Sequence, residues 1–386
     1  MTGIKFVGDI MAPSGYGNAL RDLARTLVEL DVPFFFQHIK HDRNAAKLDS
    51  FWAERMDRYL EPRPYDIIIN STTPEYYVIE SGKKNIGWTF WETDRLPDFD
   101  YNGCPRHNWV KQMNRLDELW APVSFVKNIA VEAGVKCPIH VVPWPCADKY
   151  LEAKPEVFRH KYIKDDDFVI GTVGQFTERK NFKDFVYALC SEFTQDEPVI
   201  GLIKTYAADD SPDQVRMVRD TLSAWKTGMN IPNACRFVGV HSVMSEDELL
   251  GVFQRMNLYV CTSRGEGMSG PLIHAMSLGK PVISTDFSAM ADYIDEDSAF
   301  KVLSYTLEPV HSLLHIPWYG HGQNWARLDI MEIRRAMRAA YETWREDKDK
   351  YADYGSEARS CVQGLYTRDT VRDTLSDVLG LGDHSS

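Results

Sequence analysis

Short apolar runs alternate with amphipathic stretches along almost the whole chain. Runs rich in β-branched and aromatic residues predict strands at residues 4–10, 33–39, 65–70, 84–90, 118–122 and 139–144, and again at residues 168–176, 199–204, 235–238, 258–262, 280–285 and 299–305. Between them, apolar positions recur with helical spacing, as in residues 18–30, where Leu20, Leu23 and Leu27 share one face. This alternation predicts an α/β fold with two doubly wound, Rossmann-like domains that face each other across a cleft.

Prolines near the middle of the chain mark a boundary between the two halves. Pro143, Pro145 and Pro155 interrupt regular structure there. We therefore expect a first domain over residues 1–150, a linker over residues 151–167 and a second domain over residues 168–360. The last predicted helix, residues 367–379, belongs to a C-terminal segment over residues 361–386.

Composition narrows the class of protein. Hydrophobic residues make up 44% and charged residues 26% of the 386 residues, as in ordinary globular proteins, and no apolar run is long enough to span a membrane. The net charge of −12 disfavours a broad nucleic-acid footprint. The seven cysteines form no CxxC pair, and the first residues carry no signal-peptide pattern, so we expect reduced thiols, no metal site and a cytoplasmic location.

The glycine-rich stretch at residues 261–286 predicts a ligand site. It reads as a strand, a loop around Glu266, a helix that begins at Pro271 and a further strand. A helix N-terminus at the carboxyl end of a strand favours anionic oxygens. Helical side chains lean toward the N-terminus, so His274 faces the same volume as Glu266. The alternative is an ordinary strand–helix connection with a solvated glutamate and a packed histidine.

The string EGMSGPLIHAMSLGKPVI, which begins at Glu266, resembles the pattern EGFGLPxxEAMAxGxPVI of retaining glycosyltransferases with the GT-B fold, family 4 in particular. The resemblance implies that Glu266 orients the donor sugar, together with the backbone amides of Gly267, Met268 and Ser269. His274 stands where the family has a second glutamate, which holds the ribose hydroxyls. An imidazole can also donate to or accept from a hydroxyl.

A basic pair follows the first strand of the second half. The segment FVIGTVGQF…TERKN stands where many members of this family read VGR…EKN: Lys180 matches, Arg179 is added, and Gln175 replaces the family arginine. A leaving nucleoside diphosphate carries about two negative charges, which fixed cations stabilise as the glycosidic bond breaks. We therefore expect Arg179 and Lys180 to bind the diphosphate.

Further site residues are expected from their place in the family's order of motifs. The loop with Gly15 and Gly17 resembles the N-terminal glycine loop of GT-B enzymes, which faces the diphosphate and the acceptor; a simple tight turn is the alternative. Glu92, in WETDRLPDFD, is a candidate for the acceptor wall, with a solvated loop as the alternative. The backbone around Val238 is expected to contact the nucleobase.

The resemblance implies a retaining, metal-independent glycosyltransferase with no cofactor beyond its nucleoside diphosphate sugar. The first domain would bind the acceptor, a glycan or lipid-linked glycan, the second would bind the donor, and the last helix would cross back to the first domain. Another GT-B activity, such as that of a phosphorylase or epimerase, remains open. Gln175 and His274 also leave open a degenerate binding protein. A DNA-modifying transferase that acts on a hydroxymethylated base is supported by a basic stripe: Arg106, His107, Lys111 and Arg115.

Overall fold

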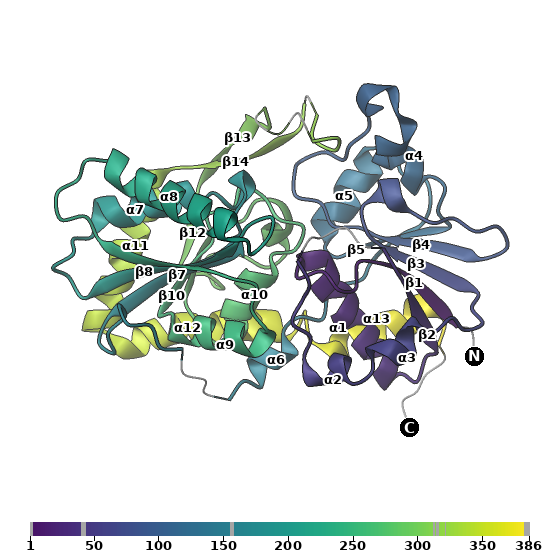
Figure 1. The fold of residues 1–386 in the computed structure, drawn as a ribbon, viewed down its shortest axis with the longest axis horizontal. Helices are drawn as coiled ribbons and strands as arrows, with labels where there is room; N and C mark the ends of the chain where they lie inside the picture. Colours follow the sequence, from purple (N-terminus) through teal and green to yellow (C-terminus); the bar gives the residue numbers. More distant parts are fainter. Residues whose placement is uncertain are drawn as a thin grey trace.

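The computed structural model describes residues 3–39, 44–154, 158–311, 313, 316–320 and 322–381. The N-terminal domain, at the right of Figure 1, contains the strands β1 (Ile4–Gly8), β2 (Phe34–His38), β3 (Ile67–Ser71), β4 (Lys84–Trp88), β5 (Glu118–Ala121) and β6 (Ile139–Val141). Its helices are α1 (Gly15–Glu29), α2 (Ser50–Ala53), α3 (Met56–Leu60), α4 (Trp109–Met113) and α5 (Ser124–Glu132), and α6 (Asp148–Leu151) follows β6.

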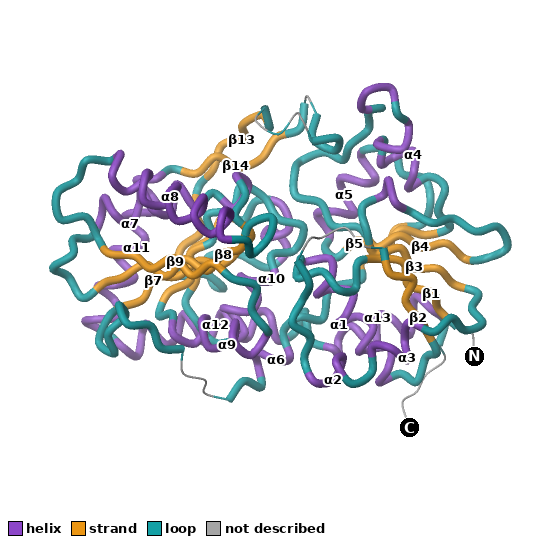
Figure 2. The backbone as a smooth tube through the Cα atoms, viewed as in Figure 1, coloured by secondary structure: helices purple, strands orange, loops and turns teal. Residues whose placement is uncertain are grey.

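The C-terminal domain repeats this plan. Its strands are β7 (Phe168–Gln175), β8 (Val199–Tyr206), β9 (Arg236–His241), β10 (Leu258–Val260), β11 (Val282–Thr285) and β12 (Lys301–Leu303). Its helices are α7 (Phe182–Glu192), α8 (Pro212–Gly228), α9 (Glu246–Arg255), α10 (Gly270–Ser277), α11 (Ile330–Glu346) and α12 (Lys348–Gln363). A separate hairpin joins β13 (Tyr305–Pro309) to β14 (Asn324–Leu328), and α13 (Arg368–Leu379) ends the fold. The predicted pair of doubly wound domains is confirmed (Figure 2).

The strand order identifies where each sheet can bind a ligand. The N-terminal sheet runs β2–β1–β3–β4–β5–β6 and the C-terminal sheet β12–β11–β10–β7–β8–β9, all pairs being parallel. The order reverses between β1 and β3 in one sheet and between β7 and β10 in the other. Open α/β sheets bind ligands beyond the carboxyl ends of the strands at such a reversal. The loops after β1, β7 and β10 are therefore the favoured positions.

Burial explains why the strands read as continuous apolar runs. In β7 and β8 every residue except the last is buried, as expected when helices cover both faces of a parallel sheet. In the N-terminal sheet Trp88 and Trp120 lie opposite each other and are fully buried, and the Trp88 Nε1 donates to the Val142 carbonyl (2.9 Å). Each domain therefore has a core that fixes the strand ends around the site.

The two domains contact each other at more than one place. Helix α13 packs against α1, below the strands of the N-terminal sheet in Figure 1, and Arg368 pairs with Glu29 (3.0 Å). On another side, Asp292 of the C-terminal domain accepts from the backbone N–H groups of Ser124 (2.5 Å) and Phe125 (3.1 Å) at the start of α5. A carboxylate at a helix N-terminus is favourable.

The hairpin β13–β14 differs from the sequence-based expectation, in which the last strand ended at residue 305. It crosses toward the N-terminal domain, where Asn324 donates to Asp94 through its backbone N–H (2.6 Å) and its side-chain amide (2.8 Å). The Asp94 N–H donates back to the Asn324 carbonyl (3.1 Å). The hairpin is thus a third contact between the domains. No helix among the described residues is long and apolar enough to cross a bilayer.

Candidate active site

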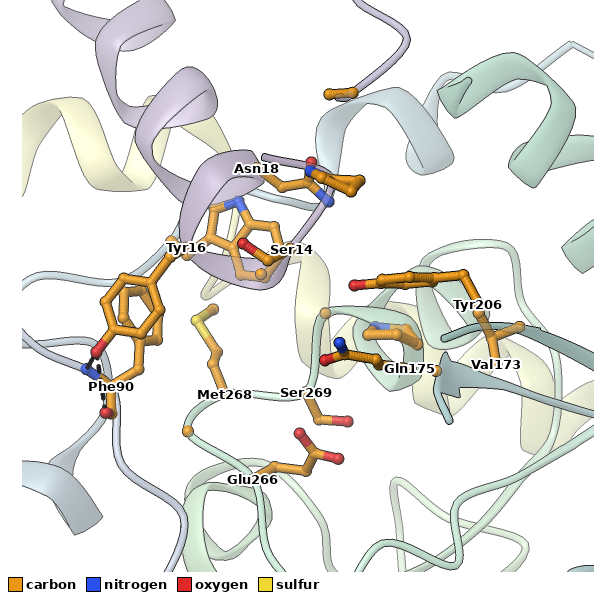
Figure 3. Close-up of a pocket in the computed structure, with 18 of the residues that line it drawn as sticks. Ser14, Tyr16, Asn18, Phe90, Val173, Gln175, Tyr206, Glu266, Met268 and Ser269 are labelled. Atoms are coloured by element: carbon orange, nitrogen blue, oxygen red, sulfur yellow. Dashed lines mark hydrogen bonds between the residues drawn. The ribbon is translucent and has the colours of Figure 1, made fainter. Parts of the chain in front are cut away.

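A cavity of about 450 Å³ lies between the domains, next to the reversal point of the C-terminal sheet. The N-terminal domain contributes the loop after β1, including Ser14 and Gly15, and the segment from Phe90 to Glu92. The C-terminal domain contributes residues from the loops after β7 and β10. Figure 3 shows Ser14 and Asn18 across the cavity from Gln175 and Tyr206, with Glu266 and Ser269 at another wall. The cavity is therefore shared by both domains.

A buried cluster of charged groups joins the predicted catalytic residues. Glu266 pairs with Lys180 (2.5 Å) through one carboxylate oxygen and with Arg179 (2.9 Å) through the other. The Arg179 Nε also contacts Glu92 across the domain boundary (3.1 Å), and Glu92 accepts from the Tyr319 hydroxyl (2.7 Å). The structure thus brings together all four predicted catalytic residues, and it adds a tyrosine that the sequence analysis did not identify.

The cluster fixes the charge states of its members. Burial alone would raise the pKa of Glu266, but the charges of Arg179 and Lys180 outweigh it and lower that pKa to about 2. Burial likewise would lower the pKa of Arg179, but Glu266 and Glu92 raise it instead. Glu266 is therefore an anion across the physiological range, and it is not suited to donate a proton.

The loop after β10 presents unpaired backbone N–H groups to the cavity. Within the described part of the chain, the N–H groups of Gly267, Met268 and Ser269 donate no hydrogen bond. The loop is held by its other polar groups, since the Glu266 N–H donates to the Ser288 Oγ (2.8 Å) and the Tyr293 hydroxyl to the Met268 carbonyl (2.6 Å). Unpaired N–H groups leading into a helix N-terminus suit an anionic oxygen.

Two glycines of this loop allow the domains to approach closely. A Cβ atom on Gly265 would lie 2.0 Å from the Glu92 carbonyl oxygen, and one on Gly267 would lie 2.8 Å from the Phe90 Cβ. Both neighbours belong to the N-terminal domain. These glycines therefore serve the domain interface as well as the loop.

His274 is packed more tightly than its predicted role suggests. Its ring stacks on Tyr150 (3.9 Å between centroids, 11° between planes) and meets Trp144 edge-on (6.2 Å). Burial, with a smaller contribution from Lys149, lowers the pKa of His274 to about 3, so the imidazole is neutral at physiological pH. It still lines the cavity. Its contact with a ribose remains a prediction, and it would be made by a neutral ring.

Not every predicted donor-binding residue reaches the cavity. Gly15 lines it, whereas Gly17 packs against the Ala12 carbonyl, which a Cβ would approach to 2.3 Å. Val238 is buried inside β9, because this strand continues to His241 rather than ending at residue 238 as expected. Residues further along the chain line the cavity in its place: Val243, Met244, Glu246 and Leu249.

The basic stripe of the N-terminal domain lies apart from the cavity. None of its four residues lines the wall. Lys111 is paired with Asp100 (2.8 Å), and Arg115 donates to Gln112 (2.6 Å). Nothing in this arrangement directs a nucleic acid toward Glu266, and the DNA-modifying alternative remains an untested prediction.

The structure also shows cavity residues that the sequence analysis missed. Trp318 comes from the segment between β13 and β14, and Lys204 and Tyr206 come from the end of β8. The run VIGLIKTY reads as a buried strand, in which a lysine is unusual. That lysine could have indicated a residue that faces a cavity. Trp318 had no comparable signal, because its position depends on how the hairpin folds over the N-terminal domain.

Residues 167–307 match the family model described as Glycosyl transferases group 1. Among solved structures, the chain is similar to Anabaena Alr3699/HepE in complex with UDP-glucose (TM-score 0.65, 14% identity, 99% of this chain and 100% of that chain). It is also similar to sucrose-phosphate synthase from Thermosynechococcus elongatus (0.64, 14%, 99% and 99%) and to a glycosyltransferase from Rickettsia africae ESF-5 (0.63, 13%, 100% and 99%). No curated protein sequence matches the chain. The match over residues 167–307 agrees with the predicted resemblance to group 1 glycosyltransferases in that part of the chain, and the structural likeness confirms the GT-B fold.

Proposed function

We propose that this protein transfers a sugar from a nucleoside diphosphate sugar to an acceptor hydroxyl, with retention at the anomeric carbon and without a metal ion or other cofactor. One observation carries the proposal: Arg179, Lys180, Glu266 and the unpaired N–H groups of the loop after β10 meet beside one cavity. Cations and oriented N–H groups are what a departing diphosphate requires.

Each group has a distinct task in this proposal. Arg179 and Lys180 bind the diphosphate and stabilise the charge that grows on it as the glycosidic bond breaks. The Glu266 carboxylate, kept ionised by both cations, accepts hydrogen bonds from the hydroxyls of the donor sugar. His274 contacts the ribose as a neutral imidazole. Because the Anabaena protein was solved with UDP-glucose, UDP-glucose is the first donor to test.

The acceptor is proposed to enter from the side of the N-terminal domain. Glu92 and Trp318 line that part of the wall, and an indole face suits the apolar face of a sugar ring. A glycan or lipid-linked glycan is therefore the proposed acceptor class. Contact between the domains would exclude water from the donor and so suppress its hydrolysis.

The test is release of nucleoside diphosphate from UDP-glucose, GDP-mannose and ADP-glucose in the presence of glycan acceptors. We expect release with one donor, which persists in EDTA and falls at least 100-fold in Glu266→Ala. Activity that EDTA abolishes and Mg²⁺ restores would contradict metal independence. Dependence of turnover on inorganic phosphate would indicate a phosphorylase.

The alternative of binding without transfer has specific support. The family arginine is replaced by Gln175, and His274 is stacked in place of a second glutamate. A protein of this kind would bind a nucleotide but release nothing from any donor sugar. Binding and turnover measured on the same preparation therefore separate the two functions.

A further inference from the structure

Lys204 belongs to the C-terminal sheet and yet faces the cavity. In the pairing of β7 with β8, Val173 lies opposite Lys204 and Gln175 opposite Tyr206, so these four side chains share one face of the sheet. All four line the cavity, and Figure 3 shows Val173, Gln175 and Tyr206 together at one wall. The Lys204 Nζ is 5.2 Å from the centre of the Tyr206 ring. The side chain therefore extends toward the carboxyl end of β8, level with Gln175.

The Lys204 ammonium has no anionic partner within the part of the chain that the structure describes. The residue is 5% exposed, and its Nζ lies against the Tyr206 ring. Asp210 and Glu248 attract it electrostatically, but neither forms an ion pair with it. A buried cation without a bonded counter-charge is unfavourable. Its position at a cavity wall points to an anion supplied by a ligand.

The other cationic side chains of the wall are already engaged. Arg179 and Lys180 contact Glu266, Lys47 pairs with Glu248 (3.0 Å), and Arg21 donates to backbone carbonyls. The group formed by Arg179, Lys180, Glu92 and Glu266 is formally neutral. A diphosphate that enters beside it would need further positive charge.

We propose that Lys204 binds a phosphate oxygen of the donor's nucleoside diphosphate, and that it supplies the cation that Gln175 does not provide. The inference rests on the proposed function, because it names a residue of the same donor site. It makes Lys204 a binding residue for the diphosphate rather than for the base or the sugar.

The surroundings of Lys204 lead to a dependence on pH. Burial lowers the pKa of Lys204 to about 8; Asp210 and Glu248 oppose this change, and Lys47 adds to it. A phosphate bound to the ammonium would raise this pKa. Below pH 8 the Lys204 side chain is already protonated before the diphosphate binds, so the affinity for the diphosphate does not change with pH. Above pH 8 binding requires Lys204 to take up a proton, so this affinity falls as the pH rises.

The test is calorimetric titration of the unaltered protein, Lys204→Met and Lys280→Met with UDP, GDP and ADP, and with the nucleoside of whichever diphosphate binds. Lys280 is a matched control: its pKa is also lowered to about 8 by burial, but its Nζ donates to the Gln254 carbonyl (2.8 Å) outside the cavity. We expect Lys204→Met to weaken diphosphate binding roughly 10- to 100-fold, as for a lost charge-assisted hydrogen bond. Nucleoside binding should change less than threefold, and Lys280→Met should retain diphosphate affinity.

Two further readouts separate binding from a structural role. The melting temperature of Lys204→Met should not fall, because an unpaired buried charge is removed. Between pH 7 and 9 the affinity of the unaltered protein should fall by up to about tenfold, and that of Lys204→Met should stay level.

Equal diphosphate affinity of the unaltered protein and Lys204→Met, or equal losses for diphosphate and nucleoside, would overturn the inference alone. Failure of the unaltered protein to bind any of the three diphosphates would overturn the proposed function, and this inference with it.

Discussion

Substitution of Glu266 by glutamine would remove the anion that Arg179 and Lys180 both contact. The carboxylate side chain is only 6% exposed. A carboxyl whose pKa falls from 4.5 to about 2 is stabilised in its charged form by about 3 kcal/mol. Glutamine keeps the shape and one acceptor oxygen but loses this charge. We therefore expect Glu266→Gln to lower the free energy of unfolding by about 3 kcal/mol, measured as a lower urea midpoint with an unchanged slope.

The same substitution should affect nucleotide binding and sugar transfer in opposite ways. Without the carboxylate, Arg179 and Lys180 have less competition for a diphosphate, so the affinity for the nucleoside diphosphate alone should stay equal or rise. Transfer should fall at least 100-fold, because the donor sugar loses its acceptor group. The control is Glu178→Gln, an exposed carboxylate next to Arg179 in the loop after β7, which should change neither the nucleotide affinity nor the transfer rate.

Acid unfolding provides an independent readout of this ion cluster. The folded pKa of Glu266 is lowered, so its contribution to stability is complete above pH 4.5 and is lost as the pH falls toward 2. The unaltered protein should lose more stability in this window than Glu266→Gln does. Equal acid profiles, together with unchanged stability and unchanged transfer in the variant, would refute the assigned role of the carboxylate.

Two further substitutions test how the domains assemble the site. Tyr319→Phe removes the hydrogen bond to Glu92 (2.7 Å). We expect a loss of roughly 1 kcal/mol in stability and a lower kcat/KM for the acceptor, with donor affinity unchanged. Weaker donor binding would contradict this assignment. Gly265→Ala places a Cβ 2.0 Å from the Glu92 carbonyl oxygen, so we expect a lower melting temperature and reduced transfer. The control is Gly134→Ala, where φ is 85° and the added Cβ meets nothing within 4 Å. This control should lower stability but leave transfer intact in the folded protein.

Much of the fold and of the charged cluster was predictable because local signals agreed with the topology. Buried parallel strands read as apolar runs, and the loop with Glu266 is followed by a proline at the start of a helix. Arg179, Lys180 and Glu266 lie in loops after β7 and β10, the strands between which the sheet order reverses. Their convergence therefore follows from the sheet topology once the strands are assigned.

Features that depend on tertiary packing could not be read in this way. Helix α12 was not predicted, because its buried face is narrow and includes Gly355, which packs directly against the backbone of Gly279. The strand β9 extends beyond its apolar start, which moves the cavity wall away from Val238. The contact of Tyr319 with Glu92 joins residues far apart in the sequence, and no local pattern indicates it.

The central claim is that this cavity binds a nucleoside diphosphate sugar, and the most direct test is the melting temperature in the presence of UDP, GDP, ADP and their hexose conjugates. A ligand at 100 times its Kd stabilises the native state by about 2.7 kcal/mol. We predict a clear rise in melting temperature with one nucleoside diphosphate and its sugar conjugate. The other two nucleoside diphosphates and their conjugates should give no comparable rise. No shift with any of these ligands at millimolar concentration would contradict the account.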